Sequence, residues 1–559
     1  MRVLLVLDDV SSPAQVRALI PDGPGSTVLA TSTAKLGELS LDGARAMPLE
    51  PLSERAGLLL LADRCGEERV AAEPDAAKAL VDHCSGLPVA LHVAAARLAN
   101  NPHLTLHDLA TELSVDENRL ASLNAGLSAS PVTAILDASY RQLPAHMAHG
   151  YRLLGWIPGP TFDAATAAAA LDSDPTSAQV LLDVLEDMSL LELTEDRHYH
   201  FHGLIHLHAR NRTDAADRVT TRLTVIHRVL RHYLILTAFA DRAVRADRLR
   251  IADLAGLLDG QTDPFAAENG PGPLDWLAAE STNIMAVLRA ADEPSLHTPA
   301  WQLAEGFTVL FLHHRHLDDW QESLRLGARY AAAAVSPAAE ARLRSLLSRP
   351  LMDLGEDEQA RQELTTAISC AEVVHDPVLH ASVMEFSGRY WDRFDPDKAV
   401  AAYQHSRELN IRGREPRGAA IATLFLGRAQ GARGDHGEAL ATLRQARTDL
   451  LALPTPDHRM AARATAASGR ALDRMGRTTE AVATLREAAN TLNALEAHAY
   501  EAEALLDLVA IAERPGTDRT TLLDDLRRAV TIHTTMGSPQ AQDLRNRLNA
   551  LTASAGPDR

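Results

Sequence analysis

The sequence predicts a mainly α-helical protein that begins with a small α/β segment and ends in a solenoid of paired helices. Three observations lead to this prediction. Only 4% of the 559 residues are aromatic, which favours helices over β-sandwiches. Small residues recur at Ala360, Ala399, Ala439 and Ala481, with spacings of 39, 40 and 42 residues. A short apolar run, Val3–Leu7, precedes two carboxylates, as at the end of a buried strand.

Length, charge and cysteine content limit the possible classes of protein. A chain of 559 residues is too long for one core and predicts three or four domains. The net charge of −19 argues against a nucleic-acid surface across the whole chain, and we expect no direct DNA binding. The three cysteines, Cys65, Cys84 and Cys370, are far apart and predict reduced thiols in a cytoplasmic protein. No apolar run of about 18 residues occurs, so no membrane span is expected.

Residues 1–52 are predicted to alternate strands and helices. The continuously apolar run Val3–Leu7 predicts a parallel strand that is covered on both faces. A helix is expected near Pro13–Leu19, a second strand at Thr27–Thr31 and a third strand at Arg45–Leu49.

Residues 53–126 are predicted to form a helical domain. Ser53 and Pro74 each introduce a helix with an acidic residue in its first turn. Gly86 is expected to serve as the C-cap of the second helix, and Pro88 to open the next one.

Residues 127–212 are predicted to form a winged-helix domain, because several helices precede a β-hairpin. The expected helices cover residues 132–142, 144–155, 163–171 and 176–188, and the expected strands are Leu190–Thr194 and His198–Phe201. Residues 213–294 are predicted to be a helical linker.

Residues 295–555 are predicted to be a repeat array. Leu364, Tyr403, Leu443 and Leu485 keep the spacing of the alanines, four residues later each time. Small and large residues at fixed offsets let paired helices pack closely, which predicts an α-solenoid of tetratricopeptide-like helix pairs. Such arrays bind ligands in a concave groove, so a protein or peptide partner is expected there.

Four motifs, in this order, resemble those of the NB-ARC class of STAND NTPases. They are Leu4–Val10 at the Walker B strand, Val28–Thr33 at the sensor strand, Gly86–Leu91 at a Gly-Leu-Pro motif, and Tyr199–Gly203 at a Met/Phe-His-Asp motif. The most similar members of this class are actinobacterial transcriptional regulators with a C-terminal tetratricopeptide array. The resemblance implies a partial P-loop α/β domain at residues 1–52, ahead of the helical, winged-helix and solenoid parts.

The resemblance also implies a nucleotide site for ADP or ATP with Mg²⁺. Asp8 would hold the metal ion and Asp9 would act on the hydrolytic water. Pro88 would lie near the adenine, and His202 would reach the β-phosphate of ADP. The implied nucleotide contacts are Thr31, Ser32, Gly86, Leu87, Pro88 and His202.

The departures from the family pattern weaken this expectation. None of the three lysines, Lys35, Lys78 and Lys398, follows a glycine or precedes Ser or Thr, so the chain has no phosphate loop. The sensor arginine is replaced by Thr33, and the acidic partner of the histidine by Gly203. ATP hydrolysis by the chain as written is therefore not expected, and whether it is an enzyme stays open.

The resemblance further implies that the strand leading into the phosphate loop lies between the first two strands. Three alternatives follow. The two strands pair with each other, another polypeptide fills the gap, or the true start lies upstream.

Two side-chain groups outside these motifs were weighed as sites. The arginines of the array are interpreted as solvated surface, with phosphate or an acidic partner as the alternative; they are Arg444, Arg463, Arg470 and Arg486. The histidines from His198 to His208 have spacings that suit metal binding, but no carboxylate or cysteine completes the set in sequence, so structural roles are favoured.

Two functions follow from the sequence. The first is a STAND-type signalling or transcriptional regulator fragment, an ADP/ATP-binding switch by ancestry, whose array senses a protein or peptide. The second is a non-enzymatic tetratricopeptide scaffold with a degenerate nucleotide-binding domain. Homo-oligomerisation is left open by the sequence.

Overall fold

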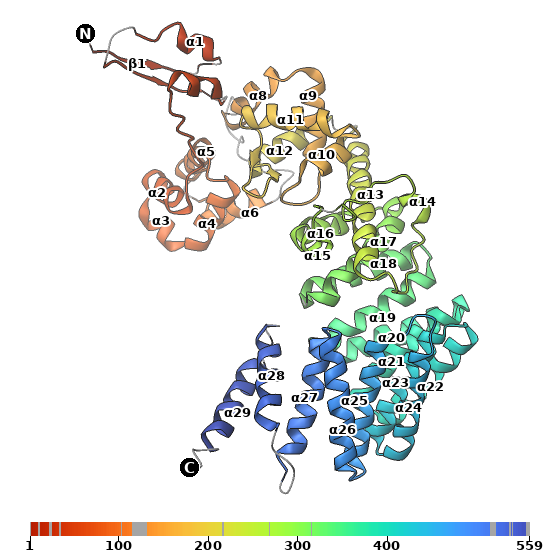
Figure 1. Ribbon diagram of the computed structural model, residues 1–559. Coiled ribbons are helices and arrows are strands. Elements are labelled where there is room, and N and C mark those ends of the chain that lie inside the picture. Colours follow the sequence, from red (N-terminus) through yellow and green to blue (C-terminus); the bar gives the residue numbers. More distant parts are fainter. Residues whose placement is uncertain are drawn as a thin grey trace. The chain divides into compact units, whose positions relative to one another are not determined.

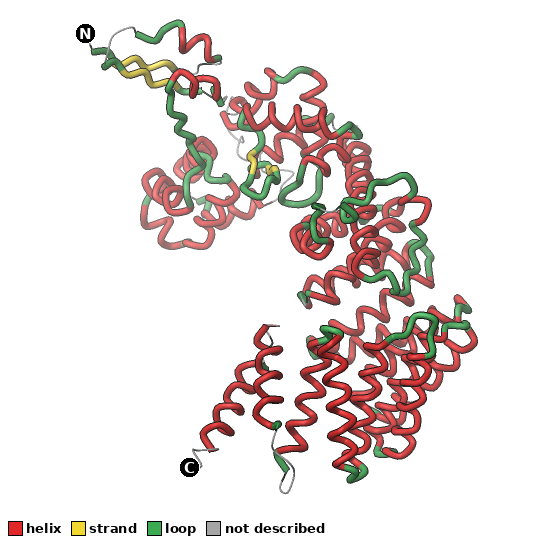
Figure 2. The backbone as a smooth tube through the Cα atoms, viewed as in Figure 1, coloured by secondary structure: helices red, strands yellow, loops and turns green. Residues whose placement is uncertain are grey.

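The computed structural model describes the chain except for residues 1, 9, 11, 22–24, 33–34, 102, 115–130, 215–216, 268, 315, 515–520, 536–537, 539 and 555–559. The described residues divide into two compact units. The first consists of Met1–Ala246 and Leu254–Leu310, and the second of Asp247–Asp253 and Phe311–Arg559. Helices dominate both units, so the mainly α prediction is confirmed (Figure 2). The predicted five-part division is finer than this split and stays a prediction.

The N-terminal segment contains β1 (Leu4–Leu7), α1 (Pro13–Arg17), β2 (Thr27–Ala30) and the 3₁₀ helix η1 (Gly37–Asp42) (Figure 1). The two strands are parallel neighbours, in register from Leu4 opposite Thr27 to Leu7 opposite Ala30. Within this chain the two strands therefore pair directly with each other, which is the first of the three alternatives; the other two concern polypeptide outside this chain and stay open. Arg45–Leu49 is a loop, so the prediction of a third strand there is also wrong.

Only one face of this two-stranded sheet is covered. On that face, strand residues Leu7, Val28 and Ala30 pack against Val16 of α1 and Leu39 of η1. On the other face, Leu4, Val6 and Leu29 are 67%, 57% and 52% exposed. The prediction of a strand buried on both faces is thus wrong for this chain, because burial requires a second layer of structure as well as an apolar sequence.

A helical subdomain follows, with α2 (Glu54–Cys65), α3 (Glu67–Ala72), α4 (Pro74–His83), α5 (Pro88–Asn100) and α6 (Leu106–Ser114). Ser53 caps α2 by accepting a hydrogen bond from the amide of Ala56 at 3.4 Å. Pro74 and Pro88 each occupy the first turn of their helices, as predicted. Leucines of these helices form a closed core, which Leu204 and Leu207 join from a later helix.

The next part contains four helices and then a hairpin, as the sequence predicts. The elements are α8 (Pro131–Gln142), α9 (Ala145–Leu154), α10 (Ala164–Leu171), α11 (Pro175–Asp187), β3 (Glu192–Leu193), β4 (Tyr199–His200) and α12 (Gly203–Asn211). The strands β3 and β4 are antiparallel. The assignment to the winged-helix family stays a prediction.

The remaining elements before the array are α13 (Arg218–Val244), α14 (Ala255–Leu258), α15 (Pro273–Ala279), α16 (Ser281–Ala290), η2 (Pro294–Leu296) and α17 (His297–His313). In the part of the chain that the structure describes, no helix is long and apolar enough to cross a membrane.

The array consists of α18 (Leu317–Ala333), α19 (Pro337–Asp353), α20 (Asp357–Val374), α21 (Pro377–Phe394), α22 (Pro396–Arg412), α23 (Pro416–Arg433), α24 (His436–Leu451), α25 (His458–Arg474), α26 (Thr478–Ala494), α27 (His498–Ala512), α28 (Leu522–Thr535) and α29 (Ala541–Ser554). From α18 to α29, each helix packs on the next. The odd-numbered helices from α19 to α27 also contact one another in series and so form the closely packed inner row of the solenoid.

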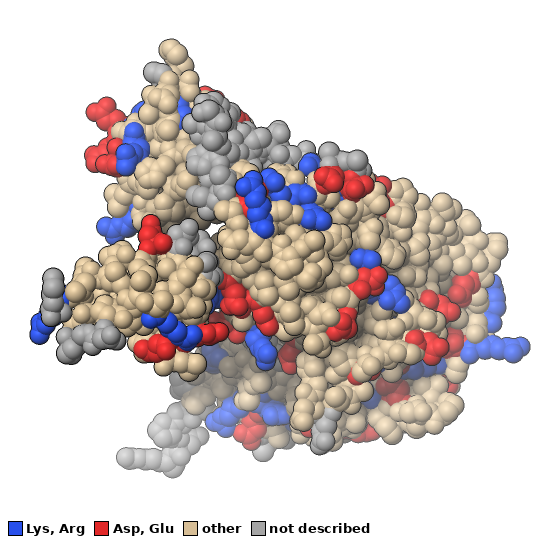
Figure 3. Space-filling view, turned by 90° about the horizontal axis from the view of Figure 1, so that it is seen from above, with Lys and Arg blue, Asp and Glu red and all other residues tan. Residues whose placement is uncertain are grey.

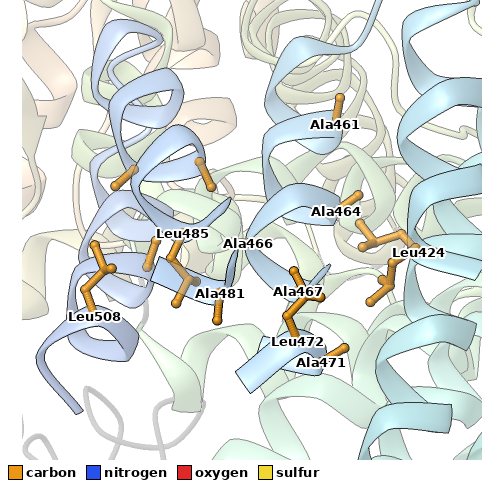
Figure 4. Close-up of a cluster of buried hydrophobic side chains, with 14 of the residues drawn as sticks. Leu424, Ala461, Ala464, Ala466, Ala467, Ala471, Leu472, Ala481, Leu485 and Leu508 are labelled. Atoms are coloured by element: carbon orange, nitrogen blue, oxygen red, sulfur yellow. The ribbon is translucent and has the colours of Figure 1, made fainter. Parts of the chain in front are cut away.

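Glycines on the inner row explain the repeat spacing. A Cβ atom on Gly388, Gly427 or Gly469 would lie 2.6–2.7 Å from a side-chain atom of Tyr403, Leu443 or Leu485, respectively. Glycine in a helix costs about 1 kcal/mol relative to alanine, so its presence here reflects the close approach of the following helix. The surrounding core is built from alanine and leucine, including Ala464, Ala467, Leu472 and Leu485 (Figure 4).

Candidate functional sites

The carboxyl ends of β1 and β2 bring Asp8 and Thr31 together. Parallel neighbouring strands end at the same edge of a sheet, where open α/β folds bind ligands. The hydroxyl of Thr31 donates a hydrogen bond of 2.5 Å to the Asp8 carboxylate, and both residues are exposed. Ser32 follows and is half-buried. Asp9 and Thr33 lie outside the described residues, so the predicted water-activating group and the altered sensor position have no structural description.

Lys35 joins the end of this segment to the hairpin-bearing part of the same unit. Its ammonium group lies 2.6 Å from the carboxylate of Glu186, and its amide donates to the carbonyl oxygen of Asp187 at 2.9 Å. The lysine closest in sequence to the predicted sensor motif therefore makes a contact with α11.

Gly86 adopts a backbone conformation that only glycine tolerates well. Its φ angle is +63°, its carbonyl oxygen accepts a hydrogen bond of 2.9 Å from the Leu52 amide, and an added Cβ would collide with the Leu52 carbonyl oxygen. Leu87 is half-buried, and Pro88 is exposed at the first position of α5. The Gly-Leu-Pro motif thus forms a tight turn that presents Pro88 to solvent.

The structure brings this turn next to the histidine motif. A Cβ atom on Gly203 would lie 2.7 Å from the hydroxyl oxygen of Ser85. A larger residue at position 203 would therefore require the Ser85 side chain to shift. Two of the four motifs, Gly86–Leu91 and Tyr199–Gly203, consequently lie on adjoining segments of the first unit.

His202 faces a carboxylate that the sequence reasoning missed. Its Nε2 atom lies 2.9 Å from a carboxylate oxygen of Glu192, and Nε2 of His200 lies 3.6 Å from the same oxygen. The expectation that no carboxylate completes the histidine set is therefore wrong. The register of the hairpin, which local sequence does not fix, places Glu192 there.

The other histidines of this run have structural partners. Nε2 of His198 lies 2.7 Å from Glu280, Nε2 of His206 lies 2.8 Å from the Gly155 carbonyl oxygen, and Nε2 of His208 lies 3.0 Å from Asp137. Burial lowers the pKa of His208. Burial also acts to lower the pKa of His198, but the hydrogen bond and charge of Glu280 outweigh it and raise that pKa.

A second candidate site lies on the inner row of the array. The guanidinium groups of Arg389, Arg428 and Arg463, from α21, α23 and α25, lie 5.0, 5.7 and 5.9 Å from the ring centre of Phe425. Arg463 also lies 4.1 Å from the ring centre of Tyr500 on α27. Such stacking holds cations over aromatic faces. Sequence reasoning interpreted Arg463 as solvated surface, whereas it is half-buried in this cluster.

The charges in this arginine cluster are only partly neutralised. Arg389 pairs with Glu385 at 2.6 Å, whereas the described residues offer no ion pair to Arg428 or Arg463. Burial is the main cause that lowers the pKa of Arg463, and the charge of Arg428 acts in the same direction. Glu503 lies nearby on α27 but forms no ion pair with either of them in the described structure.

Arg428 and Arg463 border a small, partly open recess. Its lining includes Arg428, Arg463, Arg470, Leu492, Tyr500 and Glu503. Arg470 is neutralised by Asp507 at 2.6 Å. On the face of the molecule in Figure 3, acidic and basic groups are interspersed.

Comparisons with known proteins give two relatives. The regulatory protein AfsR of Streptomyces griseus is 32% identical over 377 residues, which are 67% of this chain and 38% of that protein. AfsR of Streptomyces coelicolor is 31% identical over 452 residues, which are 79% of this chain and 44% of that protein. The chain therefore spans less than half the length of the curated relatives it matches. No model of a known protein family matches it.

Solved structures give only distant similarities. A STAND protein with a tetratricopeptide repeat sensor from Pyrococcus horikoshii has a TM-score of 0.34 and 13% identity, covering 98% of this chain and 80% of that one. Aspartyl phosphate phosphatase F from Bacillus subtilis has a TM-score of 0.39 and 10% identity, covering 74% of this chain and 96% of that one. The curated relatives show that this chain belongs to the family of the AfsR regulatory proteins, and its structure carries an array of paired helices.

Proposed function

We propose that this chain is the sensing part of a signalling or transcriptional regulator, in which the repeat array binds an acidic segment of a protein or peptide partner. The proposal rests on the guanidinium groups of Arg428 and Arg463. They form no ion pair with the described residues and lie beside a recess on the inner row of the array. The regulatory role agrees with the AfsR relatives, which are regulatory proteins.

An anionic ligand would relieve the repulsion within the cluster. Guanidinium groups held over aromatic rings are partly desolvated, so a carboxylate that reaches them forms stronger hydrogen bonds than it would in water. Arginine presents a planar fork that matches a carboxylate, and it loses little side-chain entropy when it is already stacked. The cluster also stands out against a chain with a net charge of −19, which would repel an acidic ligand elsewhere.

The extent of the inner row suits an extended ligand. The contributing helices are α21, α23, α25 and α27, and each contacts the next of them. A segment bound across several repeats would couple them, because each repeat of a solenoid is stabilised mainly by its neighbours. We therefore infer that binding stiffens the array.

Nucleotide binding forms the second part of the proposal. Asp8 would hold Mg²⁺ and Asp9 would act on water, with contacts from Thr31, Ser32, Gly86, Leu87, Pro88 and His202 to ADP or ATP. The contact between the turn at Ser85 and the start of α12 supports a shared site for Pro88 and His202. Partner binding would then shift a two-state equilibrium between nucleotide-bound forms.

The scaffold function remains the second candidate. Two observations favour it. Gly203 lacks the acidic side chain that the family has at this position, and the Asp8 carboxylate is already engaged by a hydrogen bond from Thr31. In that case the array acts alone and nucleotide has no effect on it.

Fluorescence anisotropy tests the acidic-partner proposal. A labelled peptide with a run of glutamates is titrated with the full chain, beside the same peptide with glutamines. Loss of one charged hydrogen-bonding pair costs about 1.5–3 kcal/mol, so Arg428→Gln and Arg463→Gln should each weaken binding of the acidic peptide by about 10- to 100-fold.

Arg477→Gln provides the matched control. Arg477 is exposed at the start of α26 and pairs with Glu480 at 2.6 Å, away from the recess. The Arg477→Gln variant should bind the acidic peptide with the same affinity as the unaltered chain. Equal binding of the two peptides would contradict the proposal, and displacement by millimolar inorganic phosphate would point to a phosphorylated ligand instead.

Calorimetry with Mg²⁺–ADP and Mg²⁺–ATP separates the switch from the scaffold. Binding of ADP that His202→Ala and Asp8→Ala both weaken supports the switch. No heat with either nucleotide leaves the scaffold, without affecting the test of the acidic peptide.

A further inference from the structure

The hairpin before α12 gathers two imidazoles and a carboxylate on one face. Glu192 of β3 is the direct cross-strand partner of His200 on β4. Side chains alternate along a strand, so His202 projects to the same side as His200 and is a diagonal neighbour of Glu192. Backbone register therefore brings the three side chains together, although residues 192 and 202 are separated in sequence.

The distances within this group match those around a metal ion. The Nε2 atoms of His202 and His200 lie 2.9 and 3.6 Å from one Glu192 oxygen, and the two ring centres are 5.3 Å apart. One ligand atom from each residue lies within 4.8 Å of the other two. Metal–ligand bonds of about 2.0–2.2 Å place neighbouring ligand atoms roughly 3–4 Å apart, so small rotations would suffice.

The three side chains are open to an entering ion. Their relative exposures are 55% for Glu192, 27% for His200 and 30% for His202. His200 makes no hydrogen bond through Nδ1 in the described structure, so no structural partner would have to be displaced from that ring.

We propose that Glu192, His200 and His202 form a binding site for a divalent transition-metal ion, with Zn²⁺ as the best match. Imidazole suits Zn²⁺ and similar ions, whereas Ca²⁺ and Mg²⁺ prefer oxygen ligands. Three protein ligands leave a fourth position for water or another group. Among the described residues, this is the one group of three that satisfies the distance requirement.

The ion would fasten the hairpin to the start of α12. His202 is the residue that immediately precedes this helix, and Glu192 and His200 come from the two strands. The metal site does not depend on nucleotide, but the two ligands would compete for the imidazole of His202. Metal binding is therefore tested without nucleotide.

Calorimetric titration of the metal-free full chain with Zn²⁺ is the first test. We expect each chain to bind one Zn²⁺ ion tightly, and scattered histidines elsewhere to bind further ions more weakly. Glu192→Gln, His200→Ala and His202→Ala should each lower the affinity for that tight equivalent by more than about tenfold, since loss of an outer partner alone costs 10- to 100-fold.

His405→Ala is the matched control. The rings of His380 and His405 are also 5.3 Å apart and edge-on, but no carboxylate of the described residues completes a group with them. This variant should retain the tight equivalent. The proposal would be overturned if no tight equivalent is found, or if all three site variants bind Zn²⁺ as tightly as the unaltered chain.

Co²⁺ provides a test that needs no substitution. One equivalent added to the unaltered chain should give the intense visible bands of a four- or five-coordinate ion with nitrogen and oxygen ligands. The weak spectrum of the hydrated ion at that stoichiometry would overturn the proposal even if the variants fail to fold.

Discussion

The N-terminal α/β segment and the repeat array use similar apolar side chains with different results. In the array, Leu424, Leu443 and Leu485 are almost fully buried, because each helix has neighbours on both sides. In the N-terminal segment, Leu4 and Val6 are mostly exposed, because the two strands have one covered face. Two paired strands are marginally stable by themselves. Apolar sequence therefore stabilises a fold only where the chain also supplies a second surface.

The largest expected effect contrasts two leucines from these regions. Leu485→Ala removes a fully buried side chain and should cost about 2–5 kcal/mol of unfolding free energy. Leu4→Ala should change it by less than about 0.5 kcal/mol, because the side chain already contacts water. Urea denaturation followed by circular dichroism measures both. A large loss from Leu4→Ala would show that its face is covered in solution.

The second prediction concerns the close approach of helices in the array. Gly469→Ala places a Cβ 2.6 Å from Leu485 and should cost about 1–3 kcal/mol through overpacking. Gly437→Ala, in a helix position with no atom within 4 Å, should stabilise by about 0.5–1 kcal/mol. The same denaturation experiment compares them. If both substitutions stabilise the array, glycine at position 469 is not required by packing.

The third prediction applies the same reasoning to the first unit. Gly86→Ala combines a left-handed backbone with a collision against Leu52 and should cost about 1–3 kcal/mol. Gly43→Ala has a similar φ of +83° but open space around its Cβ, so it isolates backbone strain from the collision. Hydrogen exchange at the junction of α4 and α5 should accelerate for Gly86→Ala. If Gly86→Ala and Gly43→Ala lower the free energy of unfolding equally, the left-handed backbone alone explains the loss and the collision with Leu52 contributes nothing.

The smallest effect is a difference in pH response between α12 and α25. In the first unit, burial lowers the pKa of His200, His208 and His232, so their neutral forms stabilise the fold above the unfolded pKa of about 6.5. This stability is lost as the pH falls below that value towards the folded pKa values. His198, with a raised pKa, acts in the opposite direction.

Hydrogen exchange at pH 7.5 and 5.5, corrected for intrinsic rates, measures this difference. Protection of α12 should fall on acidification more than protection of α25. His208→Gln should reduce the pH dependence of α12. An equal loss in both helices would contradict the assignment to the buried histidines.

Helix positions could be predicted because their signals are local. Pro74, Pro88 and Ser53 mark helix starts where the structure has them, since a cap or a fixed φ angle acts within one turn. The predicted close packing of helices at the repeat spacing is also confirmed, because Tyr403, Leu443 and Leu485 each pack against a glycine of the preceding helix. The strand predicted at Arg45–Leu49 failed, because an isolated strand without a neighbour has no partner for its backbone.

The mainly helical class, the presence of a helix-pair array and the motifs could be read from the amino-acid sequence alone. Periodicity, capping and motif order are properties of residues that are close in the chain. Three arrangements became visible in the folded chain alone: β1 pairs with β2, Glu192 faces His200 and His202, and arginines from successive repeats surround Phe425. These arrangements depend on strand register and on packing between distant helices, which no local pattern encodes.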